Sequence, residues 1–258
     1  MSAVLKPSTA LRDRISKEEW DTRVDLAAAY QLAAYYKWTD LIYTHFSARV
    51  PGPDHHFLIN PYGMMFDEIT ASSLVKIDLD GKIIDDPTGL GVNEAGFVIH
   101  GCIHEARPDA LAVLHTHTRA GVAVSAMTKG LLPLSQHSLR VVSELSYHDY
   151  EGIALDVDER TRMTTDLGAE NRAMILRNHG LLTLGKSVAE AFEMMYFLEC
   201  SCQIQIDALA GGADTVTLIG AGTVEKGRQQ FNRPRTGGAK QWPALLRLLD
   251  RRGSDYNT

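Results

Sequence analysis

Three histidines follow apolar segments in a pattern that suits a divalent metal ion. His115 and His117 come directly after the apolar residues 110–114, and residues two apart in a strand point to the same side. His179 comes shortly after a second apolar segment, residues 174–176. Three imidazoles leave coordination positions open, as in catalytic rather than structural zinc sites. The pattern therefore predicts a metal site at these histidines, with zinc first and manganese or iron possible with the same ligands.

Each motif taken alone has a simpler interpretation. A His-X-His pair at a strand end is often an ordinary surface feature, and residues 178–180 could form a turn around a hydrogen-bonded histidine. Two such motifs, each directly after a buried strand, favour the metal site. Gly180 would let the backbone turn away and leave the site open.

The elements that would position these histidines can be predicted from apolar periodicity and turn residues. Helices are expected at residues 20–38, 70–74, 120–127, 187–210 and 242–249, and an apolar helical face at residues 97–103 is expected to end before Pro108. Strands are expected at residues 43–50, 57–59, 76–82, 110–114, 139–145, 174–176 and 181–184. Ser187 and Glu190 would form a capping box for the longest of these helices. Long βαβ repeats are missing, which favours one α/β or α+β domain over a doubly wound sheet.

The expected organisation is an N-terminal arm (residues 1–17), a single domain (residues 18–212) and a C-terminal tail (residues 213–258). The tail is first glycine-rich and then basic, and its amphipathic helix could form an oligomer contact.

Composition excludes several classes of protein. The 258 residues include 45% hydrophobic and 22% charged residues, typical of a globular chain with a full core. The net charge of −6 argues against nucleic-acid binding. No apolar run approaches the roughly 20 residues that a transmembrane helix needs, and no signal peptide is visible. Three cysteines in apolar helical patterns suit buried thiols in a reducing, cytoplasmic compartment.

Several ordered motifs resemble the class II aldolase/adducin family. The resemblance covers about residues 20–210 and is specific because the motifs occur in the family's order. The motifs are Arg107-Pro108-Asp109, Ala112-Val113-Leu114-His115-Thr116-His117, Leu176-Arg177-Asn178-His179-Gly180-Leu181 and Gly185-Lys186-Ser187-Val188-Ala189-Glu190-Ala191-Phe192. The resemblance implies a three-layer α/β/α domain with a mainly antiparallel central sheet. It also implies zinc or a related metal on His115, His117 and His179, and a homotetramer with its active site at a subunit interface.

Two segments depart from the sugar-phosphate aldolases of this family. The position of their catalytic glutamate falls on Gly96, and Glu94 stands where they have a serine. Their Gly-Asn pair falls on Thr44-His45. An added carboxylate would repel a phosphate, so a phosphorylated substrate is disfavoured. The segment around Glu94 resembles the adducin-like branch more closely.

Three residues are candidates for proton transfer. His137 falls near the segment where the aldolases have a tyrosine that reaches a neighbouring subunit's metal site, and histidine exchanges protons near neutrality. His45 could act as acid, base or extra ligand, and Glu94 as base or ligand. The alternative for His137 is a surface histidine in a loop, and for His45 a hydrogen-bonded histidine in a strand. For Glu94 it is a carboxylate favoured by the helix dipole. His100 and His104 lie four residues apart on a helix, but the family pattern makes His100 structural.

Three functions are compatible with these residues. The first is a metal-dependent lyase that binds a carbonyl or carboxylate oxygen of a small non-phosphorylated hydroxy- or oxo-acid and breaks a C–C bond. Loss of the aldolase glutamate favours decarboxylation over aldol cleavage, since decarboxylation needs no base to remove a hydroxyl proton. The second is an Fe(II)-dependent oxygenase or decarboxylase on the same scaffold. The third is a non-catalytic adducin-like assembly module, against which the presence of all three histidines argues.

Overall fold

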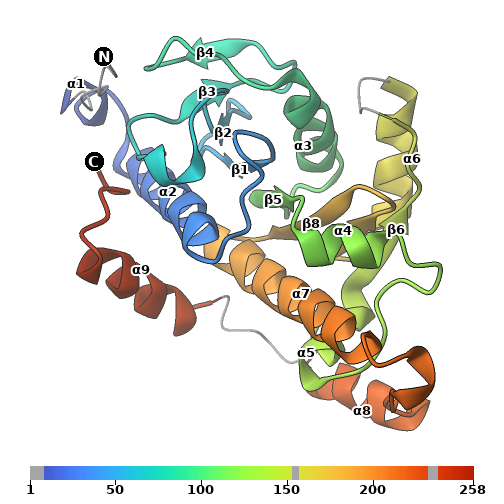
Figure 1. Ribbon diagram of the computed structural model, residues 1–258. Coiled ribbons are helices and arrows are strands. Elements are labelled where there is room, and N and C mark those ends of the chain that lie inside the picture. The colour runs from blue at the N-terminus through green and yellow to red at the C-terminus, as the bar shows by residue number, and fades with distance from the viewer. Residues whose placement is uncertain (1–8, 153–156, 232–237) are drawn as a thin grey trace.

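The computed structural model describes residues 9–152, 157–231 and 238–258, and its centre is a β-sheet (Figure 1). Within these residues the sheet has eight strands in the order β4-β3-β2-β1-β5-β8-β7-β6. Neighbouring strands are antiparallel except β6 and β7, which are parallel. The strands are β1 (His45–Arg49), β2 (Phe57–Ile59), β3 (Val75–Ile77), β4 (Ile83–Asp85), β5 (Ala112–Thr116), β6 (Leu145–His148), β7 (Ala173–Leu176) and β8 (Gly180–Gly185). The mainly antiparallel sheet is as predicted.

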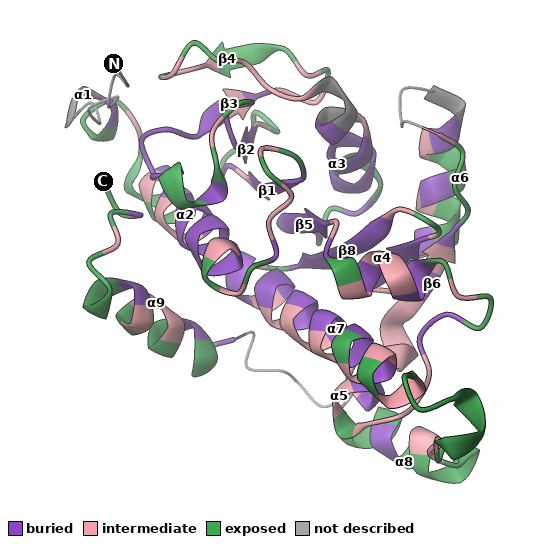
Figure 2. Cartoon of the chain, in the orientation of Figure 1, coloured by how far each residue is buried: buried purple, intermediate pink, exposed green. Residues whose placement is uncertain are grey.

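Helices cover both faces of this sheet and produce three layers. The helices α2, α4 and α7 pack on one face, and α3 and α6 pack on the other. The helices are α1 (Thr9–Arg12), α2 (Lys17–Tyr35), α3 (Glu94–Ala106), α4 (Arg119–Ser125), α5 (Gln136–Leu139), α6 (Val157–Leu167), α7 (Val188–Leu209), α8 (Ala221–Phe231) and α9 (Gln241–Arg251), with 3-10 turns at Phe66–Glu68, Val142–Glu144 and Ala213–Thr215. Buried residues concentrate in the central strands and in α2, α3 and α7 (Figure 2). The predicted α/β/α layering is confirmed.

Strand alternation decides which side chains reach the candidate site. In β5, Leu114 enters the core beneath α2 and α7, whereas Val113 enters the core beneath α3 and α6. His115, two residues after Val113, therefore lies on the α3 side of the sheet. In β1, Phe46 enters the α2 core, so His45 also points to the α3 side. Two strands thus bring histidines to one face of the sheet.

The predicted strand at residues 139–145 is wrong. The structure has the short helix α5 and a 3-10 turn there, and β6 begins only at Leu145. Ser135 caps α5, because its hydroxyl accepts the N–H of Ser138 and the Ser138 hydroxyl accepts the N–H of Ser135. This local hydrogen bonding overrides the alternating apolar pattern.

Two further predictions need correction between β2 and β4. The expected helix at residues 70–74 is a single turn, in which the Ser73 hydroxyl bonds the N–H and carbonyl of Thr70. The strand expected to reach Lys82 ends at Ile77, because the carboxylate of Asp78 accepts two backbone N–H groups and forms a turn.

The capping box at α7 is present only in part. The Ser187 hydroxyl accepts the N–H of Glu190, as expected. The Glu190 carboxylate, however, accepts the N–H of Lys186 and pairs with Arg172 instead of reaching back to Ser187.

The two ends of the chain are more helical than predicted. The one-turn helix α1 lies inside the expected arm, whose residues 1–8 are outside the described part of the chain. In the tail, α9 was predicted and α8 was not. α9 packs on α2 of the same chain, where Trp242 donates a hydrogen bond to Asp25 at 2.8 Å. The division into arm, domain and tail stays a prediction. None of the described helices has the length and apolar character needed to cross a membrane.

Candidate metal centre

The imidazoles of His115, His117 and His179 converge at one edge of the sheet. His115 lies in β5, His117 follows it directly, and His179 lies in the turn between β7 and β8. Their ring centroids are 4.7–4.8 Å apart, and one nitrogen of each ring lies within 4.8 Å of those of the other two. The structure therefore brings together the three histidines that the sequence predicted, and they could hold a metal ion.

Hydrogen bonds orient two of these rings toward a common centre. His115 Nδ1 donates to the Leu181 carbonyl at 2.9 Å, and His117 Nδ1 donates to the Asp40 carboxylate at 3.0 Å. In both rings Nε2 is the atom left for a further partner, and the two Nε2 atoms lie 2.9 Å apart. A proton on one of these nitrogens, or a bound cation, satisfies both of them. The donor set thus fits a divalent metal, with partners behind the rings as in known histidine sites.

Burial keeps two of the rings in the form that binds metal. Desolvation, followed by the neighbouring His179 and His117, lowers the pKa of His115 well below its usual value. Desolvation and then His117 lower the pKa of His179 to about 4. Both rings are neutral near pH 7, so no proton has to leave before a cation binds.

The turn that carries His179 is held by two unusual backbone positions. Asn178 has a left-handed backbone (φ 55°), a conformation that asparagine tolerates better than most residues. Gly180 is not among the glycines with positive φ. Gly180 instead lies against the Thr116 backbone, and a Cβ there would overlap the Thr116 carbonyl oxygen. The glycine therefore permits close approach of the two segments that carry the imidazoles.

His45 lies beside the three imidazoles. It pairs with His115 across β1 and β5, and the two ring centroids are 5.3 Å apart. A Cβ at Gly96 would lie 2.7 Å from His45 Nε2, so the His45 ring occupies space that a side chain at position 96 would need. Burial is the main cause that lowers the His45 pKa to about 3.

The other two acid/base candidates have no described contact with the three imidazoles. Glu94 is the first residue of α3, but its side chain is outside the described part of the structure. His137 lies in α5 rather than in a loop, with its ring 5.8 Å from Phe197 of α7. No contact recorded for the described residues joins His137 to the three imidazoles of its own chain. Its role at a neighbouring subunit stays a prediction.

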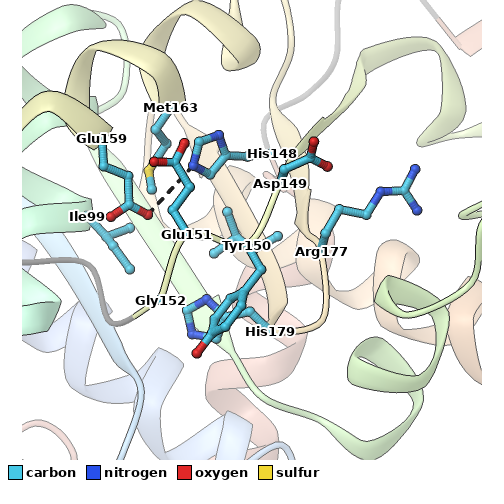
Figure 3. A pocket seen from close by; sticks show the side chains of 11 residues that line it. Ile99, His148, Asp149, Tyr150, Glu151, Gly152, Glu159, Met163, Arg177 and His179 are labelled. Atoms are coloured by element: carbon cyan, nitrogen blue, oxygen red, sulfur yellow. Dashed lines mark ion pairs between the residues drawn. The ribbon is translucent and has the colours of Figure 1, made fainter. Parts of the chain in front are cut away.

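A small cavity adjoins His179 (Figure 3). Its volume is about 10 Å³, and Tyr150, His148 and Glu159 are among its lining residues. The exposed Tyr150 lies over His179, at 6.2 Å between ring centroids. Opposite them, the buried His148 bonds Asp166 at 2.7 Å and lies 3.7 Å from Glu159. The cavity has room for about one water molecule on one side of the His179 ring.

Asp40 is a site residue that the sequence analysis missed. It lies in the loop after α2, 77 residues before the histidine that it contacts, and no local pattern marks it. Replacing Asp40 by alanine should weaken metal binding by about 10–100-fold, because His117 would lose the acceptor that orients its ring. Competition with a chromogenic chelator measures this affinity. Asp54→Ala, at an exposed carboxylate, is the control, and equal affinity of the two variants would contradict the role of Asp40.

Comparison with known proteins identifies the family. The family model for the class II aldolase and adducin N-terminal domain matches residues 24–206. The chain belongs to the class II aldolase and adducin family.

Solved and curated members of this family cover the chain almost completely. An aldolase II superfamily protein from Pseudomonas syringae has 56% identity and a TM-score of 0.94, over 96% of this chain and 100% of that protein. L-fuculose 1-phosphate aldolase from Glaciozyma antarctica PI12 has 28% identity and a TM-score of 0.83, over 99% of this chain and 98% of that protein. Alpha-adducin from Rattus norvegicus is 43% identical over 244 residues, which are 90% of this chain and 33% of the adducin. The predicted class II aldolase-like fold is thus confirmed.

Proposed function

We propose that this family member is a metal-dependent lyase that breaks a C–C bond in a small non-phosphorylated hydroxy- or oxo-acid. His115, His117 and His179 would hold the divalent metal, zinc being the first candidate. The observation that carries the proposal is the convergence of three imidazoles whose ligand nitrogens all lie within 4.8 Å of one another. The relative named L-fuculose 1-phosphate aldolase supports lyase chemistry on this fold.

The metal would act as a Lewis acid for negative charge that develops on a substrate oxygen as the adjacent C–C bond breaks. The chain itself orients and desolvates the site. Asp40 and the Leu181 carbonyl fix two rings, and the buried His45 offers a polar atom beside His115. We propose His45 and Glu94 as groups that contact the substrate. His137 would act across a subunit interface in a homotetramer.

His45 supports the choice of a substrate without phosphate. Its ring fills the space beside Gly96, so the position next to His115 holds an aromatic ring rather than a small hydroxyl group. A phosphate dianion needs several close N–H or O–H donors. A carbonyl or carboxylate oxygen needs only the open metal position and therefore suits this pocket better.

A substrate panel tests the proposal. Purified protein is loaded with zinc, manganese or Fe(II) and incubated with small hydroxy- and oxo-acids, with and without oxygen. Turnover without oxygen uptake is the expected result. Turnover that consumes oxygen would identify the Fe(II) oxygenase instead, and efficient cleavage of fuculose or ribulose phosphate would contradict the choice of substrate.

A non-catalytic assembly module is the second candidate, favoured by the 43% identity to alpha-adducin. Such a module would have no use for an open metal site. Absence of turnover in the panel, together with absence of stoichiometric metal, would favour the module over the lyase.

A further inference from the structure

A row of buried hydrogen bonds beneath α3 ends at the metal centre. His45 Nδ1 contacts His100 Nε2 at 2.8 Å, and His100 Nδ1 contacts the Ser47 hydroxyl at 2.5 Å. The Ser47 hydroxyl contacts His104 Nε2 at 2.7 Å, and His104 Nδ1 contacts the Ala110 carbonyl at 2.8 Å. All four of the polar side chains are at most 4% exposed. The row joins β1 to α3 without any carboxylate.

The Ala110 carbonyl at the end of the row fixes which atom donates in every hydrogen bond of the row. The Ala110 carbonyl can only accept, so His104 carries its proton on Nδ1 and accepts at Nε2. Ser47 must then donate its single proton to His104, and it accepts from His100 Nδ1.

The donor in the remaining bond, between His45 and His100, follows by the same reasoning. His100 Nε2 has no proton, so His45 Nδ1 donates to it and His45 Nε2 keeps a lone pair. This assignment needs only neutral rings. Neutral rings are what burial without a carboxylate partner favours.

The lone pair of His45 faces the metal centre without a partner from the chain. The His45 ring lies beside His115, and none of the described residues donates a hydrogen bond to its Nε2. Gly96 packs against the edge of this ring without a side chain that could bond Nε2, since a Cβ there would lie 2.7 Å from that atom. A bound ligand is therefore the partner that the site leaves for this atom.

We propose that Ser47, His100 and His104 are positioning residues that hold His45 Nε2 as a fixed acceptor, and that His45 thereby selects ligands with a hydroxyl group next to the metal-binding oxygen. This inference rests on the proposed function, because it assigns the substrate class for the same site. A hydroxyl donates to the lone pair, whereas an ether or phosphate oxygen places a second lone pair against it. The preferred substrate class is a hydroxy-acid.

The tautomer is tested directly by NMR on the full chain labelled with 15N-histidine and free of metal. Long-range 1H–15N correlations report which ring nitrogen carries the proton. We expect His45, His100 and His104 all to carry it on Nδ1. In Ser47→Ala the row is interrupted, and His100 and His45 should become mixtures of both tautomers. A proton on His45 Nε2 in the unmodified chain would overturn the inference, and this result needs no variant to fold.

Selectivity is tested by calorimetric titration of zinc-loaded protein with glycolate and with methoxyacetate, which differ only in hydroxyl and methoxy groups. The unmodified chain should bind glycolate about tenfold more tightly than methoxyacetate, because one hydrogen bond typically contributes about this factor to the affinity. Ser47→Ala should lose most of this preference and keep its zinc. Ser201→Ala removes another buried serine hydroxyl, bonded only within α7, and should keep the preference. Equal preference in Ser47→Ala and the unmodified chain would refute the selection by His45.

The NMR measurement and the titration together distinguish a failure of this inference from a failure of the proposed function. A chain that binds none of zinc, manganese and Fe(II) would disprove the metal-dependent lyase, while the tautomer measurement would still confirm or refute the row. A chain that binds zinc and turns over hydroxy-acids, but shows no dependence on Ser47, would disprove only the positioning role.

Discussion

Replacing His115 or His179 by alanine is expected to abolish stoichiometric metal binding. Two remaining imidazoles cannot hold a divalent ion as three do, and we expect the affinity to fall by more than the roughly 10–100-fold that loss of an orienting partner costs. Elemental analysis after dialysis and chelator competition measure the loss. Metal at 100 times its dissociation constant stabilises a folded protein by about 2.7 kcal/mol, so added zinc should raise the melting temperature of the unmodified chain but not that of the His115 and His179 variants.

His55→Ala is the matched control, because His55 is exposed in the loop between β1 and β2. This variant should bind metal and respond to zinc as the unmodified chain does. Circular dichroism checks that the His115 and His179 variants remain folded. Stoichiometric metal in both of these variants would show that the three imidazoles do not form the site, and the proposed function would fail with them.

The convergence of the three histidines could be predicted because each lies at the end of a strand with a strong local signal. The apolar residues of β5 and β7 are buried on both faces of the sheet, so they form continuous hydrophobic runs. Polar residues directly after such runs have to lie at the sheet edge. The relation of His115 to His117 then follows from strand geometry alone.

The partners of these ligands could not be predicted, because their contacts join distant parts of the chain. Asp40 is 77 residues from His117, and Ser47 is 53 and 57 residues from the two histidines of α3 that it contacts. The sequence places those two histidines on one helical face, which suggested only a weak metal motif. The antiparallel pairing of β1 with β5, and the packing of α3 over both strands, shows that they act in a hydrogen-bonded row instead.

Replacing Gly180 by alanine is expected to lower the free energy of unfolding by roughly 1–3 kcal/mol and to weaken metal binding as well. The new methyl group would overlap the Thr116 carbonyl oxygen and lie 3.1 Å from Cδ2 of His117. Neither strand can move away easily, because Thr116 pairs with Leu181 and Gly180 pairs with Leu176. Any relief of the overlap must separate the turn that carries His179 from the end of β5.

Urea unfolding of the metal-free protein measures the stability change, and chelator competition measures the change in metal affinity. Gly222→Ala in α8 is the control, since nothing lies within 4 Å of its added Cβ and alanine favours a helix. That variant should be at least as stable as the unmodified chain and should bind metal equally well. If Gly180→Ala matched it in both measurements, close approach of the two segments would not be what holds the imidazoles together.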